Sequence, residues 1–191
     1  MRWFLGTILT IVVVVGLYFG SLVKSLAGLM DAVQAGNGAE VVARTDINEL
    51  RQSLTDQIVR TYLKRVGNPN PVQRMLANTY GASVADAMLQ KFLTAENITN
   101  LLRTGSITGA PEDANWTMGP LSKIDVTKLT DLLGRLRPIQ PLRVEIRTSD
   151  ATSPNEYSAI GLHFEGGSWK LSNLLLPQDA LQKLARSLPA R

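Results

Sequence analysis

The sequence predicts an α+β protein: an N-terminal transmembrane helix, then several helices, a three- to four-stranded antiparallel sheet and a C-terminal helix. Three observations predict this class. The chain starts with a long uncharged apolar segment, continues with apolar residues at helical spacing, and changes to alternating apolar and polar residues near position 142. Helices that precede the strands, rather than alternate with them, are typical of an α+β domain.

The N-terminal segment is long and apolar enough to cross a bilayer. It contains no charged residue from position 3 to position 23. A helix of this length spans about 31 Å, close to the thickness of the hydrocarbon layer. We therefore expect residues 1–24 to be a membrane anchor with the lipid bilayer as its partner. The apolar and interfacial residues assigned to this anchor are Trp3, Phe4, Val13, Tyr18 and Phe19.

Two alternatives concern the same segment. Ser25-Leu26-Ala27 carries small residues at the positions that a signal peptidase reads, and cleavage there would release a soluble periplasmic protein. Against cleavage, the apolar region is longer than the usual ~7–15 residues of a signal peptide. Gly16 and Gly20 have the small-xxx-small spacing that lets membrane helices approach closely, although glycine is common in such helices. They are a possible dimerisation site, and the oligomeric state is left open.

Residues 25–191 are expected to form one soluble α+β domain, with a helical part at about 25–136. The anchor helix runs on to Gly36-Asn37-Gly38, which stops it. A short helix follows at 39–44, and the acidic capping pattern of Asp46 and Glu49 begins a long helix that Gly67 closes. Further helices are predicted to start at four residues, namely Pro71, Ser83, Thr94 and Asp125.

The sheet and the terminal helix are expected at about 142–191. Strands are predicted at 142–147, 157–164 and 168–176, with a two-residue hairpin at Gly166-Gly167. Pro138 and Pro141 are expected to break the chain before the first of these strands. We expect one apolar face on the sheet, with the helices laid across that side and the helix after Pro177 covering it.

Composition excludes several chemistries. There is no cysteine, which removes disulfides, thiolate nucleophiles and zinc–thiolate sites. The net charge is +4, of which Arg2 and Lys24 beside the apolar segment contribute two, so a nucleic-acid partner is not expected. The basic cluster of Arg60, Lys64 and Arg65 is interpreted as a solvated helix face.

His163 is the single histidine of the chain. It is expected on the sheet face opposite Ile160, Leu162 and Phe164, either solvated or hydrogen-bonded to a neighbouring strand. One histidine without cysteine does not support the usual zinc sites or a serine triad. We therefore expect no cofactor, no metal site and no catalytic residues, and interpret the chain as not being an enzyme.

Three stretches resemble an uncharacterised bacterial family of membrane-anchored proteins, catalogued as domain of unknown function 2939. They are Leu29–Leu54 (LMDAVQAGNGAEVVARTDINELRQSL), Phe92–Leu102 (FLTAENITNLL) and Gly161–Pro177 (GLHFEGGSWKLSNLLLP). The resemblance implies a membrane-tethered protein with an extracytoplasmic domain. It implies no activity, because these residues are packing and turn positions.

Arg2 and the amino terminus mark the expected cytoplasmic end of the anchor, opposed only by Lys24. We therefore expect a single-pass protein of the bacterial inner membrane with a cytoplasmic N-terminus and a periplasmic domain.

Three functions follow as expectations, in order of preference. The first is a non-catalytic, extracytoplasmic domain that binds a protein or another component of the envelope. The second is binding of a small molecule or lipid in a cavity between the sheet and the helices. The third is an enzyme whose polar groups meet only in space, for example Asp150, Glu165 and Arg147.

Overall fold

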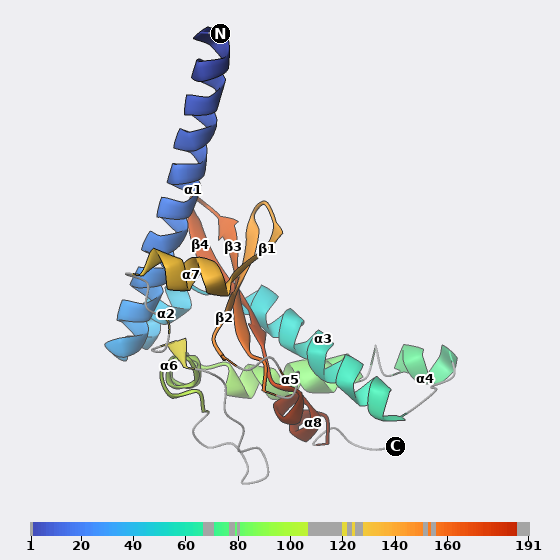
Figure 1. The fold of residues 1–191 in the computed structure, drawn as a ribbon. Helices are drawn as coiled ribbons and strands as arrows, with labels where there is room; N and C mark the ends of the chain where they lie inside the picture. Colours follow the sequence, from blue (N-terminus) through green and yellow to red (C-terminus); the bar gives the residue numbers. More distant parts are fainter. Residues whose placement is uncertain are drawn as a thin grey trace.

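A computed structural model of the chain describes residues 2–66, 71–76, 79, 81–106, 120–121, 124, 128–150, 153 and 156–186 (Figure 1). The helices are α1 (Arg2–Gln34), α2 (Gly38–Ala43), α3 (Ile47–Val66), α4 (Pro71–Leu76), α5 (Ala82–Phe92), α6 (Ala95–Thr104), α7 (Leu129–Arg135) and α8 (Gln178–Arg186). The strands are β1 (Leu136–Gln140), β2 (Arg143–Arg147), β3 (Ala159–Glu165) and β4 (Ser168–Leu175). The predicted α+β class and order of elements are confirmed.

The first helix has two halves with opposite surroundings. Large apolar side chains from Ile8 to Leu17 are exposed, and Leu17 itself is 70% exposed. Leu22 and Leu26, further along the same helix, are fully buried among side chains of the sheet and of the other helices. The helix continues without a break to Gln34, and Gly36 then takes a left-handed backbone at φ 68°. One helix therefore serves both as the apolar extension of the molecule and as part of the core of its domain.

The four strands form one antiparallel sheet in the order β1-β2-β3-β4. β1 was not expected as a strand, because Leu136 was predicted to end a helix and Pro138 to break the chain. The reason for the error is that β1 is an edge strand, where a proline without an N–H is tolerated. Asp125, the predicted cap of the preceding helix, lies outside the described residues.

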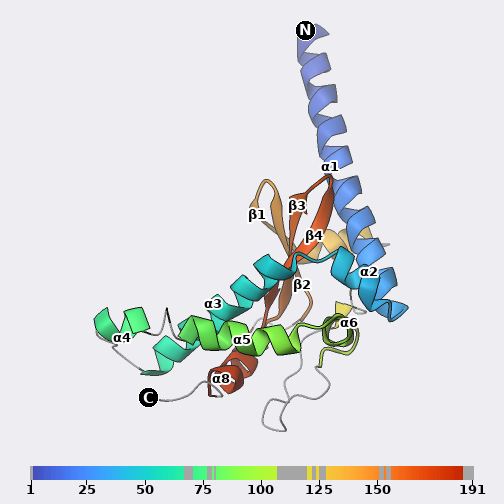
Figure 2. The ribbon, with the colours of Figure 1, turned by 180° about the vertical axis from the view of Figure 1, so that it is seen from behind.

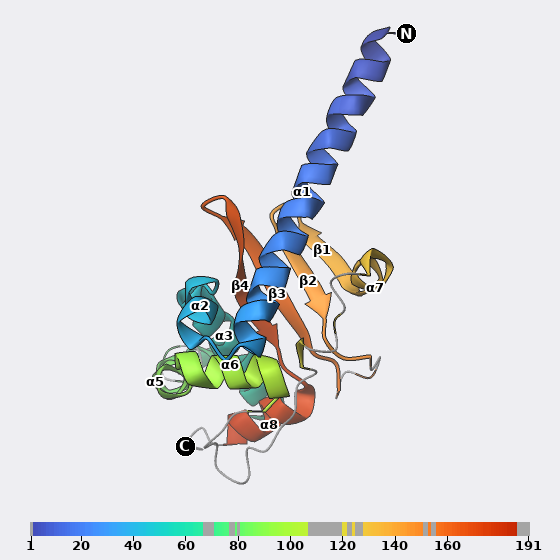
Figure 3. The same ribbon diagram turned by 90° about the vertical axis from the view of Figure 1, so that its left-hand side faces the viewer.

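Different helices cover the two faces of the sheet (Figures 2 and 3). On one face, the indole Nε1 of Trp169 donates a hydrogen bond to Ser21 Oγ of α1 at 3.0 Å. On the other face, Ser53 of α3 donates to Asn173 Oδ1 at 2.6 Å. These faces are opposite because Trp169 pairs with Phe164, Asn173 pairs with Gly161, and side chains alternate along β3. The expectation that the helices lie across one side only is wrong.

Side-chain caps begin three of the helices, α2, α3 and α6. Thr94 Oγ1 accepts from the N–H of Asn97 and caps α6 as predicted, and Gly105 ends that helix at φ 80°. Ser83 does not cap α5, because Gly81 occupies the N-cap position there and makes no side-chain bond. The C-terminal helix α8 makes its main contact with α3 rather than covering the sheet directly.

We predict that Leu26→Ala lowers the free energy of unfolding of the domain by about 2–5 kcal/mol, because it leaves a cavity in the core. Leu17→Ala is the matched control in the same helix, since Leu17 is 70% exposed and Leu26 is 0% exposed. Urea unfolding of both variants in the same detergent measures the difference. Equal stabilities would show that the second half of α1 is not part of the folded domain.

Candidate functional site

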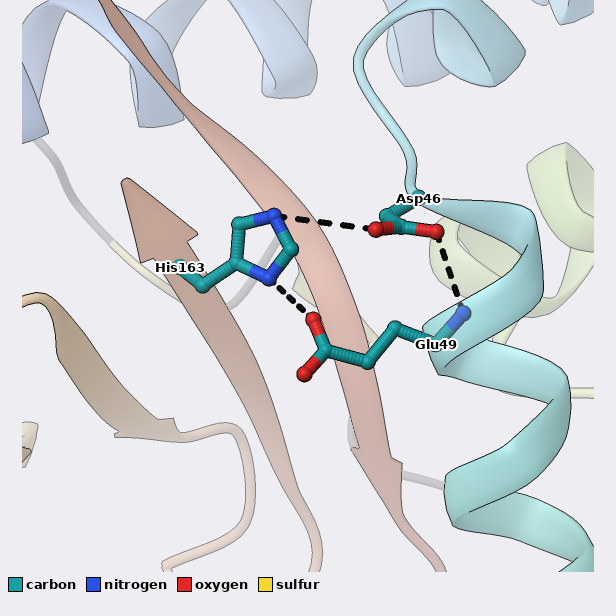
Figure 4. Close-up of side chains that lie close together, drawn as sticks. All are labelled: Asp46, Glu49 and His163. Carbon is teal, nitrogen blue, oxygen red and sulfur yellow. Dashed lines mark hydrogen bonds and ion pairs between the residues drawn. The ribbon is translucent and has the colours of Figure 1, made fainter. Parts of the chain in front are cut away.

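Three chemically active side chains lie together where the start of α3 meets the sheet (Figure 4). They are Asp46, Glu49 and His163, called the His163 cluster below, and one ligand atom from each lies within 4.8 Å of those of the other two. Asp46 immediately precedes α3, Glu49 lies in its first turn, and His163 lies near the end of β3. The cluster therefore joins two segments that are far apart in the sequence.

Backbone hydrogen bonds position the two acidic residues. The N–H of Asp46 donates to the carbonyl of Leu171 in β4 at 2.8 Å, which ties the start of α3 to the sheet. Asp46 Oδ1 accepts from the N–H of Glu49 at 3.0 Å, as expected of a helix cap. The Glu49 side chain, instead of turning back to the cap, contacts His163 and Arg143. The predicted capping pair thus leaves Asp46 Oδ2 and the Glu49 carboxylate facing the sheet.

His163 is buried, with 11% of its side chain exposed. Its Nδ1 is bonded to Glu49 Oε2, while its Nε2 is buried and has no hydrogen-bond partner among the described residues. Nε2 lies 3.7 Å from Asp46 Oδ2 and 3.5 Å from Glu165 Oε2. The expectation of a solvated or strand-paired histidine is therefore wrong, because α3 covers this face of the sheet and supplies the partners.

Two cations complete the surroundings of the cluster. Arg143 forms an ion pair with Glu49, and Lys170 Nζ lies 3.0 Å from Glu165 Oε2. The hydrogen bond from Lys170 holds the pKa of Glu165 below its ordinary value. Three carboxylates, one imidazole and two cations thus share a small region. This set of groups can hold a proton on the imidazole or bind a cation between the imidazole and the carboxylates.

A second candidate site is a groove of about 460 Å³ between α3, α8 and the sheet. Among the described residues, its lining contains three cations and no carboxylate. It comprises Gln57, Arg60, Thr61, Lys64, Arg137, Tyr157, Leu175, Leu176, Gln178 and Leu181. Tyr157 donates its hydroxyl hydrogen to Glu145, and burial together with this bond raises the pKa of Tyr157. Arg60 and Lys64, interpreted as a solvated face, are exposed and border this groove.

The structure places the predicted anchor residues on the first part of α1. Val13 is 51% exposed, and Tyr18 stacks edge-on against Trp169 with ring centroids 5.1 Å apart. Phe19 packs beside Tyr18. For Trp3 and Phe4, the structure describes the helical backbone only. No atom outside α1 comes within 4 Å of a Cβ built on Gly16 or Gly20, so their dimerisation stays a prediction.

The polar groups considered for an enzyme do not gather at one place. Arg147 lies at the end of β2 opposite Ala159, where β3 begins, whereas Glu165 ends β3. Asp150 forms an ion pair with Arg135 at 2.7 Å. The partners of Glu165 are Lys170 and His163 instead. Sequence reasoning missed the pairing of His163 with Glu49, for which no local pattern gives a signal because the two residues are 114 positions apart.

Comparison with known proteins confirms the family resemblance. Residues 11–101 match the model of the family described as "Protein of unknown function (DUF2939)". This segment runs from the apolar half of α1 into α6 and includes Asp46 and Glu49, while His163 lies beyond it. No curated protein and no solved structure matches the chain significantly.

We predict that Glu49→Gln lowers the free energy of unfolding by about 1–3 kcal/mol in the presence of a chelator, because it removes the charged partner of both His163 and Arg143. Glu96→Gln is the control, since Glu96 is exposed in the first turn of α6. Chemical denaturation of the two variants gives the comparison. If Glu49→Gln behaves like Glu96→Gln, the cluster does not hold α3 on the sheet.

Proposed function

We propose that this protein is a single-pass protein of the bacterial inner membrane whose periplasmic domain binds a protein or another envelope component and is not an enzyme. One observation carries the proposal. α1 is long and apolar enough to cross a membrane, its first half is exposed, and its second half is built into the core of the domain. A helix that satisfies its own backbone hydrogen bonds and presents bare apolar side chains is suited to lipid rather than to water.

The packing of α1 supports an uncleaved anchor over a removed signal peptide. Cleavage after Ala27 would remove Leu22 and Leu26, both of which are fully buried. It would also remove Ser25, whose Oγ accepts a hydrogen bond from the N–H of Trp169 at 3.2 Å. A leader that is discarded has no need of such contacts with the mature domain.

The absence of a break in α1 supports a domain that lies directly on the membrane surface. Trp169 follows the β3–β4 turn and stacks against Tyr18, so this turn lies beside the boundary of the apolar half. The β1–β2 turn lies at the same end of the sheet, because Arg143 pairs with His163 near the end of β3. Figure 1 shows both turns directed toward the N-terminal part of α1.

The β1–β2 turn has the side chains of a membrane-contacting loop. Ile139 is 60% exposed and Leu142 is 55% exposed, and Arg143 follows them. Exposed apolar side chains at this end of the sheet suit the boundary between headgroups and acyl chains, while Arg143 is held by Glu49. We infer that this turn enters the headgroup region of the bilayer that holds α1.

A second candidate function is binding of an anionic small molecule or lipid in the groove beside α8. The observation that favours it is the lining, in which Arg60, Lys64 and Arg137 stand over the apolar Leu176 and Leu181 without a carboxylate. Such a lining suits a ligand with a negative head and an apolar body. An anionic amphiphile extracted from the purified protein would favour this function over a protein partner.

We predict that a membrane-impermeant maleimide, applied after permeabilising the outer membrane, labels Glu40→Cys in full-length protein of the membrane fraction. The chain has no cysteine, so the introduced thiol is the only target. Val13→Cys is the control and stays unlabelled, because its side chain lies in the lipid. A labelled but shortened soluble product would indicate a cleaved signal. Labelling only after lysis of the inner membrane would contradict a periplasmic domain.

We predict that an environment-sensitive fluorophore on Leu142→Cys shows blue-shifted emission and quenching by headgroup-region nitroxide lipids when the protein is reconstituted in nanodiscs. The same fluorophore on Glu40→Cys, at the start of α2, should show neither effect. The reason is that Leu142 lies at the same end of the sheet as the β3–β4 turn, next to which Trp169 stacks against Tyr18. Identical spectra at both positions, in protein that remains in the nanodisc, would contradict contact of the turn with lipid. The proposal that α1 is an anchor would still stand.

A further inference from the structure

We propose that His163, Asp46 and Glu165 bind a divalent transition-metal ion, with Glu49 as the outer partner that orients the histidine. The ion would join the start of α3 to the β3–β4 hairpin. This inference goes beyond the membrane-tethered binding function, and neither depends on the other.

The first argument is the spacing of the ligand atoms. Two donors that share one ion at about 2.1 Å each lie roughly 3.0–3.4 Å apart in octahedral or tetrahedral geometry. His163 Nε2 lies 3.5 Å from Glu165 Oε2 and 3.7 Å from Asp46 Oδ2. These distances are too long for hydrogen bonds and a few tenths of an ångström longer than those between ligands of one ion. The ligand atoms that already lie within 4.8 Å of one another are those of Asp46, Glu49 and His163. A common ion therefore requires the exposed Glu165 side chain to turn toward Asp46.

The second argument is the state of the imidazole. The whole His163 residue is 9% exposed, and its buried Nε2 has no hydrogen-bond partner among the described residues. Buried polar atoms are normally satisfied, so this nitrogen requires a partner. Glu49 occupies the Nδ1 side of the ring, so Nε2 is the nitrogen directed between Asp46 and Glu165 and the one that can bind an ion. Carboxylate, imidazole and metal in this order are the usual arrangement at protein metal sites.

The third argument concerns charge and access. Asp46, Glu49 and Glu165 face His163, while Arg143 and Lys170 neutralise two of these three charges. These five charged side chains thus leave one net negative charge beside the imidazole, which attracts a cation. The side chain of Glu165 is 56% exposed and that of Lys170 is 32% exposed, so their contact lies at the solvent edge. A metal ion enters from this edge by displacing the Lys170 ammonium from Glu165.

The donor set indicates the class of ion. One imidazole with two carboxylates suits Zn²⁺, Mn²⁺ or Fe²⁺ better than Ca²⁺, which prefers oxygen ligands alone. We take Zn²⁺ as the probe for affinity. Because the ion links α3 to the hairpin, it binds the folded state and should raise the melting temperature.

The test uses full-length protein in detergent, without a histidine tag and freed of metal by a chelator. His163 is the only histidine, so its imidazole gives one set of ¹⁵N signals. Addition of one equivalent of Zn²⁺ should move the Nε2 signal, leave Nδ1 protonated and raise the melting temperature. An unchanged Nε2 signal would overturn the proposal and leave the membrane-tethered function untouched.

Variants assign the ligands by isothermal titration with Zn²⁺. We expect Glu49→Gln to weaken binding about 10–100-fold, as removal of an outer partner does, and Asp46→Asn and His163→Asn to weaken it by about 100-fold or more. Glu40→Gln, which removes a half-exposed carboxylate paired with Arg44 in α2, should leave the affinity unchanged. Circular dichroism establishes that each variant is folded. Unchanged Zn²⁺ affinity in folded Asp46→Asn or Glu49→Gln would overturn the assignment even if His163→Asn does not fold.

Discussion

The packing of the second half of α1 against β4 is the contact on which the rest of the structure depends. Leu22 and Leu26 fill the core from one side of the sheet, and Ser21 and Ser25 accept both N–H groups of Trp169. Without these contacts the sheet would expose an apolar face, and the apolar half of α1 would be a tether of no fixed direction. With them, the orientation of the domain relative to the apolar half of α1 is fixed by the fold itself.

The His163 cluster performs the corresponding task on the other face of the sheet. Here the contact is polar: α3 presents carboxylates to a histidine and an arginine of the sheet, and the N–H of Asp46 bonds to β4. A buried polar contact is costly unless every group is satisfied, which makes the unpartnered Nε2 of His163 significant. Apolar burial holds both faces, since Leu50 and Ile58 of α3 are as fully buried as Leu22 and Leu26 of α1. On the α3 side, paired charges are added to it.

Features governed by nearby residues could be predicted from the sequence. The ends of α1 and α6 follow from Gly36 and Gly105, and the start of α6 from Thr94, because these signals act within one helical turn. The antiparallel strands β2 to β4 follow from their alternation and from Gly166-Gly167.

Features that depend on distant residues could not be predicted. β1 contains Pro138 and is stable only because β2 pairs with one side of it. The burial of His163 depends on α3, whose acidic first turn looks from sequence alone like a helix cap. The covering of both sheet faces by helices could not be predicted for the same reason. From the sequence alone, Gly161 and His163 look like solvent-facing positions, and only the position of α3 shows that they are covered.

Native-state hydrogen exchange of the full chain in nanodiscs tests most directly whether one rigid helix belongs to both the bilayer and the domain. The account predicts that amides of residues 22–34 exchange only on global unfolding, with the same protection as those of β4, because they share one core. Fast exchange of residues 22–34 while β4 stays protected would contradict it, and would make the second half of α1 a linker.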